Sequence, residues 1–215
     1  MHIVWKAALG AAIVVSVATS ARAGVNLVSD GDFSSPSGGA SFVTYFGGST
    51  IGPWAVTGGS VDLIGGYWQA PNSVGGSVDL DGDSPGGLSQ NIVTIPGHTY
   101  EASFYLSGNP DGTPATKMLT VSAGATSPSF SYTVGGNTHG DMDYVLEDFT
   151  FTATGSSTTL DFTSDDVGTP YGPVIGDVMV AAVPEPATIL LLGTGVFAVA
   201  AIRQRRMHQT CRRVG

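Results

Sequence analysis

The stretch Thr99-Tyr100-Glu101-Ala102-Ser103-Phe104-Tyr105-Leu106 decides the fold class of this chain. Tyr100, Ala102, Phe104 and Leu106 alternate with Glu, Ser and Tyr. Because successive side chains of a β-strand point to opposite faces, this alternation predicts a strand that lays one apolar face against a core.

Comparable short runs fill the rest of residues 24–183, and clusters of Gly, Pro, Asn and Asp separate them as turns do. We expect these further strands at 60–64, 77–81, 88–95, 117–123, 129–134, 144–153, 158–163 and 173–180. No stretch of this region has a helical period. Roughly ten short strands with frequent turns predict an all-β sandwich or jelly roll in one domain, residues 24–183.

One hexapeptide occurs twice within the predicted domain. Gly-Gly-Ser-Val-Asp-Leu stands at 58–63 and again at 75–80. Two copies are too few for a solenoid, so two similar strands around a connecting loop are the simpler account. In each copy we expect Val and Leu to face the core and Ser and Asp to face outward.

The N-terminal segment has the layout of an export signal. A short polar start with Lys6 is followed by an apolar stretch at 7–17 and by Ala21-Arg22-Ala23. This is the order of a charged region, an apolar region and an A-x-A cleavage site, so we expect a signal peptide at 1–23 and a mature start at Gly24. The alternative is a membrane anchor, for which the apolar stretch is short.

The C-terminal segment, residues 184–215, has the layout of a sorting signal. Pro184, Glu185 and Pro186 precede an uncharged run at 187–202, and Arg203, Arg205 and Arg206 follow it. At about 1.5 Å per residue the run spans roughly 24 Å, against a bilayer core of about 30 Å. A buried core helix is therefore the alternative, but the basic cluster favours a transmembrane helix with a cytoplasmic tail.

This order of Pro-Glu-Pro, apolar run and Arg cluster resembles the PEP-CTERM signal of Gram-negative bacteria. The resemblance implies an exosortase-type processing enzyme as partner. It also implies that the protein is exported, held transiently in the inner membrane, and then released to the cell surface or the extracellular space.

The charge of the predicted domain argues against partners that carry phosphate groups. Residues 24–183 contain one Lys, Lys117, no Arg, and sixteen acids, a net charge of −15. Such a surface repels nucleic acid and anionic lipid, because phosphate binding needs Lys and Arg. It suits solubility outside the cell and it suits calcium. The only cysteine, Cys211, lies in the tail, so the predicted domain has no disulfide.

Several motifs along residues 24–180 resemble a known family. They are Asn26-Leu27-Val28-Ser29-Asp30-Gly31-Asp32-Phe33, Trp54 to Ile64, Ser77 to Gly82, Leu88-Ser89-Gln90, Gly97 to Tyr100, Gly108-Asn109-Pro110 and Gly172 to Val178. In this order they resemble the bacterial choice-of-anchor C family and its relatives among plant cell-wall proteins of unknown function. The resemblance implies a galactose-binding-like β-sandwich, with 26–33 as its opening strand. It implies no established enzymatic activity.

The same resemblance implies a structural calcium site. In calcium-holding modules of this fold an acid near the first strand and an Asp in the last strand meet at one ion, and the matching residues here are Asp30, Asp32 and Asp177. The chain departs from that pattern at Ser34 and Gly176, where the modules carry oxygen ligands. A second stretch, 79–83, resembles the start of an EF-hand loop, but a turn at Gly82 explains it equally well.

Aromatic residues are the candidates for sugar binding, because the apolar face of a sugar ring stacks on a π-face. Tyr67 and Trp68 stand in the turn-rich stretch 65–74, so we expect an exposed platform there. The alternative is that both rings fold back over the sandwich. Trp54 is expected in the core.

Signatures of catalysis are sparse. His98 and His139 stand in turns and form no metal-ligand spacing, and no G-x-S-x-G elbow or phosphate loop is present. We therefore predict an exported, noncatalytic surface or matrix protein that binds carbohydrate or exopolysaccharide. A purely structural matrix protein is the first alternative, and a carbohydrate-active hydrolase is the second.

Overall fold

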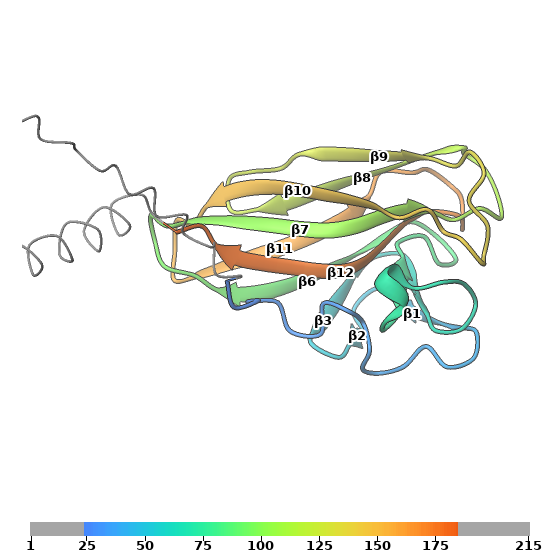
Figure 1. Ribbon diagram of the computed structural model, residues 1–215, viewed down its shortest axis with the longest axis horizontal. Helices are drawn as coiled ribbons and strands as arrows, with labels where there is room; N and C mark the ends of the chain where they lie inside the picture. Colours follow the sequence, from blue (N-terminus) through green and yellow to red (C-terminus); the bar gives the residue numbers. More distant parts are fainter. Residues whose placement is uncertain (1–23, 185–215) are drawn as a thin grey trace, which may run out of the picture.

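The fold is an all-β sandwich, and its two sheets overlap in the view of Figure 1. The computed structural model describes residues 24–184. The predicted signal peptide, Glu185, Pro186, the run at 187–202 and the arginines lie outside the described residues. Among the residues described, no helix is long and apolar enough to cross a membrane.

Two antiparallel sheets form the sandwich, each with six strands. In their spatial order, the strands of the first sheet are β1 (Phe42–Phe46), β4 (Ser60–Ile64), β5 (Ser77–Asp79), β12 (Pro173–Ala182), β7 (Thr99–Gly108) and β10 (Val145–Thr152). Those of the second are β2 (Thr50–Ile51), β3 (Trp54–Gly58), β6 (Gly86–Val93), β11 (Ser157–Ser164), β8 (Thr116–Ala123) and β9 (Ser129–Thr133). The predicted all-β sandwich is confirmed.

The core lies between the sheets and follows the alternation seen in the sequence. In β7, Tyr100, Ala102, Phe104 and Leu106 are all buried, whereas Glu101 is exposed. Trp54 is fully buried, with its ring tilted against Phe33 and edge-on to Phe162, as expected for a core residue. The alternation of apolar and polar residues therefore indicates which face of a long strand packs against the core.

One prediction about the N-terminal part is wrong, and three strands there were missed. Residues 26–33 do not form a regular strand, because Asp30 and Phe33 adopt positive φ angles of 50° and 51° and turn the chain. Three strands, β1 to β3, were not predicted. Hydrogen bonds still tie this segment to β12: the Leu27 amide donates to the Val180 carbonyl, the Val178 amide donates to the Gly31 carbonyl, and the Val180 amide donates to Asn26 Oδ1.

The repeated hexapeptide forms neighbouring strands. β4 and β5 pair antiparallel, with Leu63 opposite Val78 and Asp62 opposite Asp79. Val and Leu of both copies enter the core as expected. The polar residues are not solvent-exposed, however: Ser60, Ser77 and Asp79 are buried, because loops cover the outer face of these strands.

Both ends of the described chain lie at one pole of the sandwich (Figure 1). The Val183 amide donates a hydrogen bond to the Thr99 carbonyl, so β12 leaves the sheet where β7 begins. The loops that follow β7 and precede β12 lie at the opposite pole.

Candidate functional site

A pocket of about 210 Å³ opens on the outer face of the first sheet, toward the pole opposite the chain ends. Its floor is a row of side chains across three strands, because Thr44 pairs with Asp62 and Asp62 pairs with Asp79. Directly paired residues project from the same face, so three polar groups meet there. The walls come from the segments after β4, β5 and β7 and from the segment before β12.

Trp68 forms part of the inner wall and is not an exposed platform. Its side chain is 5% exposed and packs with Ile64, Met142 and Val174 in a small second core on the outer face of the sheet. Its indole Nε1 donates a hydrogen bond to Ser77 Oγ at 2.9 Å. The prediction of an exposed Trp68 is therefore wrong, because the 65–74 segment folds back and buries its apolar ring.

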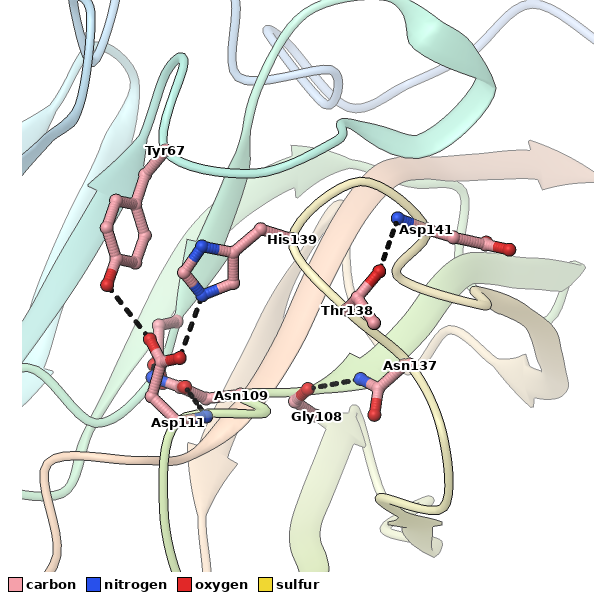
Figure 2. A network of polar contacts seen from close by, with 9 residues as sticks. Tyr67, Gly108, Asn109, Asp111, Asn137, Thr138, His139 and Asp141 are labelled. Atoms are coloured by element: carbon pink, nitrogen blue, oxygen red, sulfur yellow. Dashed lines mark hydrogen bonds and ion pairs between the residues drawn. The ribbon is translucent and has the colours of Figure 1, made fainter.

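Tyr67 is the exposed member of the pair, with 36% of its surface accessible. Its ring lies edge-on to Phe42, with centroids 5.3 Å apart, and 4.5 Å from the ring of His139. Its hydroxyl donates to Asp111 Oδ2 at 3.0 Å (Figure 2). This hydrogen bond and, to a smaller extent, burial raise the pKa of Tyr67 above its usual value.

Asp111 connects the rim of the pocket to its interior. Its Oδ1 contacts His139 Nε2 at 2.8 Å, and its backbone amide donates to Asn109 Oδ1 at 2.9 Å (Figure 2). Asn109 in turn donates from Nδ2 to Asp79 Oδ2 at 2.6 Å. A chain of hydrogen bonds thus connects the Tyr67 hydroxyl to the buried Asp79 and holds the Tyr67 ring in place at the pocket.

Asp79 and Asp81 are buried carboxylates, not parts of an exposed calcium loop. Asp79 Oδ1 accepts hydrogen bonds from the amides of Asp81 and Gly172. Burial raises the pKa of Asp79 well above its usual value, and burial raises the pKa of Asp81 to about 6. The 79–83 stretch therefore secures the segment before β12 instead of presenting an open ring of ligands.

Lys117, on β8, is fully buried close to these acids. Its Nζ donates to the carbonyls of Gly112 and Tyr171 at 2.9 Å and 2.6 Å. Burial lowers the pKa of Lys117, while the nearby Asp166, Asp79 and Asp81 charges oppose that shift. Lys117 is the only Lys or Arg of residues 24–184, so that segment exposes no Lys or Arg side chain to solvent.

The residues expected to bind calcium lie where the chain ends meet. The Val178 amide donates to the Gly31 carbonyl, so the segment that contains Asp177 lies next to the segment that contains Asp30 and Asp32. Asp177 Oδ2 accepts a hydrogen bond from Asn72 at 2.7 Å, and Asp30 Oδ2 is buried without a hydrogen-bond partner. Across residues 24–184, no three His, Cys, Asp or Glu side chains gather as a ready metal-binding group.

A match to a known protein family establishes the family of this chain. Residues 26–181 match the family described as protein of unknown function (DUF642). This chain belongs to the DUF642 family. Residues 182–206 match the PEP-CTERM protein-sorting motif, so the predicted sorting signal is confirmed as well.

Among characterised proteins, this DUF642 chain is similar to halomucin of Haloquadratum walsbyi, at 33% identity over 144 residues. The match covers 64% of the chain, which spans only about 2% of that relative. Similar solved structures include a family 35 carbohydrate-binding module from Clostridium thermocellum, with 14% identity, 65% and 97% of the two chains covered and a TM-score of 0.45. Another is TmCBM61 in complex with β-1,4-galactotriose, with 14% identity, coverage of 74% and 99% and a TM-score of 0.39.

The sequence interpretation missed most of the pocket. Asp111 and His139 stand in turns, and their contact depends on how two distant loops approach each other. Asp62 carried a usable signal, because the two copies of the hexapeptide align it with Asp79, its partner across the strands. Two neighbouring strands with Asp at the same place put both carboxylates on one face.

Proposed function

We propose that this DUF642 protein is an exported, noncatalytic carbohydrate-binding protein whose ligand contacts the pocket beside Tyr67. The observation that carries the proposal is the meeting of exposed rings and hydrogen-bonding side chains at one hollow. Phe42 and Tyr67 are 43% and 36% exposed, and Tyr171 lines the same pocket with Asp62 and Asp83.

These groups suit the two surfaces of a sugar. The C–H face of a pyranose packs on an aromatic ring, and its hydroxyls bond to carboxylates and amides. The pocket is smaller than the roughly 300–1,000 Å³ typical of closed small-molecule sites. We therefore expect it to hold one part of a longer chain, with the remainder lying along the edge strand β1.

Removal of the Tyr67 ring tests the proposal. Tyr67→Ala should weaken binding to a polysaccharide by roughly 1–3 kcal/mol, by analogy with other aromatic stacking contacts. It should lower the free energy of unfolding by only about 1 kcal/mol, since the ring is partly exposed. A glycan array with the full-length protein in detergent identifies a ligand, and titration calorimetry compares the variants.

Tyr67→Phe is the matched control, because it keeps the ring and removes the hydroxyl that bonds to Asp111. It should retain most of the affinity that Tyr67→Ala loses. Equal binding by all three proteins would favour the alternative of a structural matrix protein. Release of new reducing ends from the bound polysaccharide would instead favour the hydrolase alternative.

Export and sorting make a separate prediction. The A-x-A site and the sorting motif predict two cleavages, so the intact mass of the mature protein should lack residues 1–23 and everything beyond about Pro186. Deletion of the exosortase-type enzyme should leave the tail in place. A mature species that still carries Arg203 to Arg213 in cells with that enzyme would contradict the proposed processing.

We also propose a calcium ion at Asp30, Asp32 and Asp177, as a structural element. Asp30, Phe33, Asn72, Ser73 and Asp177 all adopt φ angles between 49° and 57°. Hydrogen bonds join the segments that contain them, so five of the six non-glycine residues with positive φ in the described stretch 24–184 gather in one region. Such backbone conformations cost free energy and persist where the surroundings, including a bound ion, hold them.

Chelation should therefore lower the melting temperature of the protein, and added calcium should restore it because the ion binds the native state. Asp177→Ala should abolish the response. Asp148→Ala, on an exposed position of β10, is the matched control and should respond as the wild type does. An unchanged melting curve in chelator would remove the proposed ion.

A further inference from the structure

The pocket combines a paired set of acids with the absence of any exposed Lys or Arg on the described residues 24–184. Asp62 and Asp79 are directly opposite across β4 and β5, and Asp83 lies at the mouth of the same pocket. Like charges in this arrangement repel each other. Asp62 and Asp83 line the same pocket, and burial, with a smaller contribution from the negative charge of Asp83, raises the pKa of Asp62.

Four side-chain hydrogen-bond donors of the pocket are already engaged by neighbouring acceptors. Thr44 Oγ1 donates to Asp62 Oδ1 at 2.6 Å, and Tyr67 donates to Asp111. Asn109 Nδ2 donates to Asp79, and the Trp68 indole donates to Ser77. The capacity left for a ligand is mainly acceptor capacity, in the second oxygen of Asp62 and in the carboxylate of Asp83.

A ligand for this pocket must therefore bring donors and must not bring negative charge. A uronate or sulfated sugar would place an anion against several carboxylates without an exposed Lys or Arg to pair with it. A protonated amine supplies three donors and one positive charge, and it also binds favourably over aromatic faces such as those of Phe42 and Tyr67.

We infer that the pocket recognises an amino sugar: an oligosaccharide whose protonated amine lies between Asp62 and Asp83 while its ring stacks on Tyr67. This inference rests on the proposed carbohydrate-binding function and names the class of sugar.

The test compares three hexasaccharides: hexaglucosamine with its amines protonated, its fully N-acetylated form, and an oligogalacturonate. Full-length protein in detergent is titrated with each by calorimetry. Hexaglucosamine should bind at least about tenfold more tightly than the acetylated hexamer, because its amine adds a charge-assisted hydrogen bond. The oligogalacturonate should bind most weakly of the three. Asp83→Asn should reduce the preference to about threefold or less, and Tyr67→Ala should weaken both glucosamine-based ligands.

Because the whole surface is acidic, a remote control is essential. Asp148→Asn removes the same charge from an exposed position on β10, at the opposite edge of the sheet, and should leave the preference unchanged. If Asp148→Asn and Asp83→Asn have equal effects, attraction is diffuse and the inference is wrong.

The remaining outcomes separate this inference from the function on which it rests. Tighter binding of the acetylated hexamer or of the oligogalacturonate, lost in Tyr67→Ala, would overturn the amino-sugar inference while leaving carbohydrate binding at the pocket intact. Absence of any Tyr67-dependent binding, in the array as well as with these ligands, would overturn both.

Discussion

Trp68→Ala should lower the free energy of unfolding by about 3–5 kcal/mol, the range for a buried aromatic side chain truncated to Ala. The indole is almost completely buried and packs on Ile64, Met142 and Val174, so its removal leaves a cavity in the second core. It also leaves Ser77 without its donor. Urea unfolding followed by fluorescence or circular dichroism measures the change.

The neighbouring residue provides the control for this result. Tyr67→Ala removes a ring of similar size one position earlier, but from a partly exposed site, and should cost only about 1 kcal/mol of stability. The two substitutions should therefore separate stability from ligand binding. If Trp68→Ala unfolds with an unchanged midpoint, Trp68 does not belong to a core and the structure of the 65–74 segment is wrong.

Lys117→Met should be comparably destabilising at neutral pH, by about 3–5 kcal/mol, because it leaves buried carboxylates without their nearby positive charge. The Lys117 ammonium lies close to Asp79, Asp81 and Asp166 and holds two backbone carbonyls. Met keeps the length and apolar stem of the side chain and removes only the charge and the donors. Denaturant unfolding of both proteins at several pH values measures the difference.

The dependence on pH has a defined sign. Burial raises the pKa of Asp81 from 3.8 to about 6 in the folded protein. A raised carboxyl pKa adds stability that is fully present below the unfolded pKa and is lost as pH rises through the folded pKa. The wild type should therefore become more stable as pH falls from about 7.5 to about 5, and the cost of Lys117→Met should shrink over the same range.

Asp81→Asn isolates the responsible group, since it removes the titrating proton and nearly preserves the shape. It should raise stability at neutral pH and flatten the profile between about pH 4 and about pH 7. A wild-type profile that falls steadily as pH decreases across this window would show that the buried acids do not control stability.

The sequence predicted the long strands well because their pattern is one-sided. Tyr100 to Leu106 shows this clearly, since four apolar residues face one core and the other face is free to be polar. β1 carries no such pattern. It is an edge strand whose five residues are exposed or half-buried, so both of its faces tolerate the mixture Phe-Val-Thr-Tyr-Phe.

The candidate site was predictable only where it depends on local chemistry. Tyr67 and Trp68 stand close to glycines in the sequence, and this pattern pointed to the pocket. Both residues line it. Which ring is exposed depends on the second core that Met142 and Val174 form, and these residues are more than seventy positions away in the sequence. The contact of Asp111 with His139 likewise exists only after β7 and β10 have paired.

β12 links the pocket to the opposite pole of the sandwich. Tyr171, just before this strand, lines the pocket, and the strand then runs ten residues to Ala182, about 30 Å at the usual rise of a β-strand. An anchor joined beyond Val183 therefore attaches at the far pole from the pocket. The pocket would then lie at the end of the sandwich that faces away from the point of attachment.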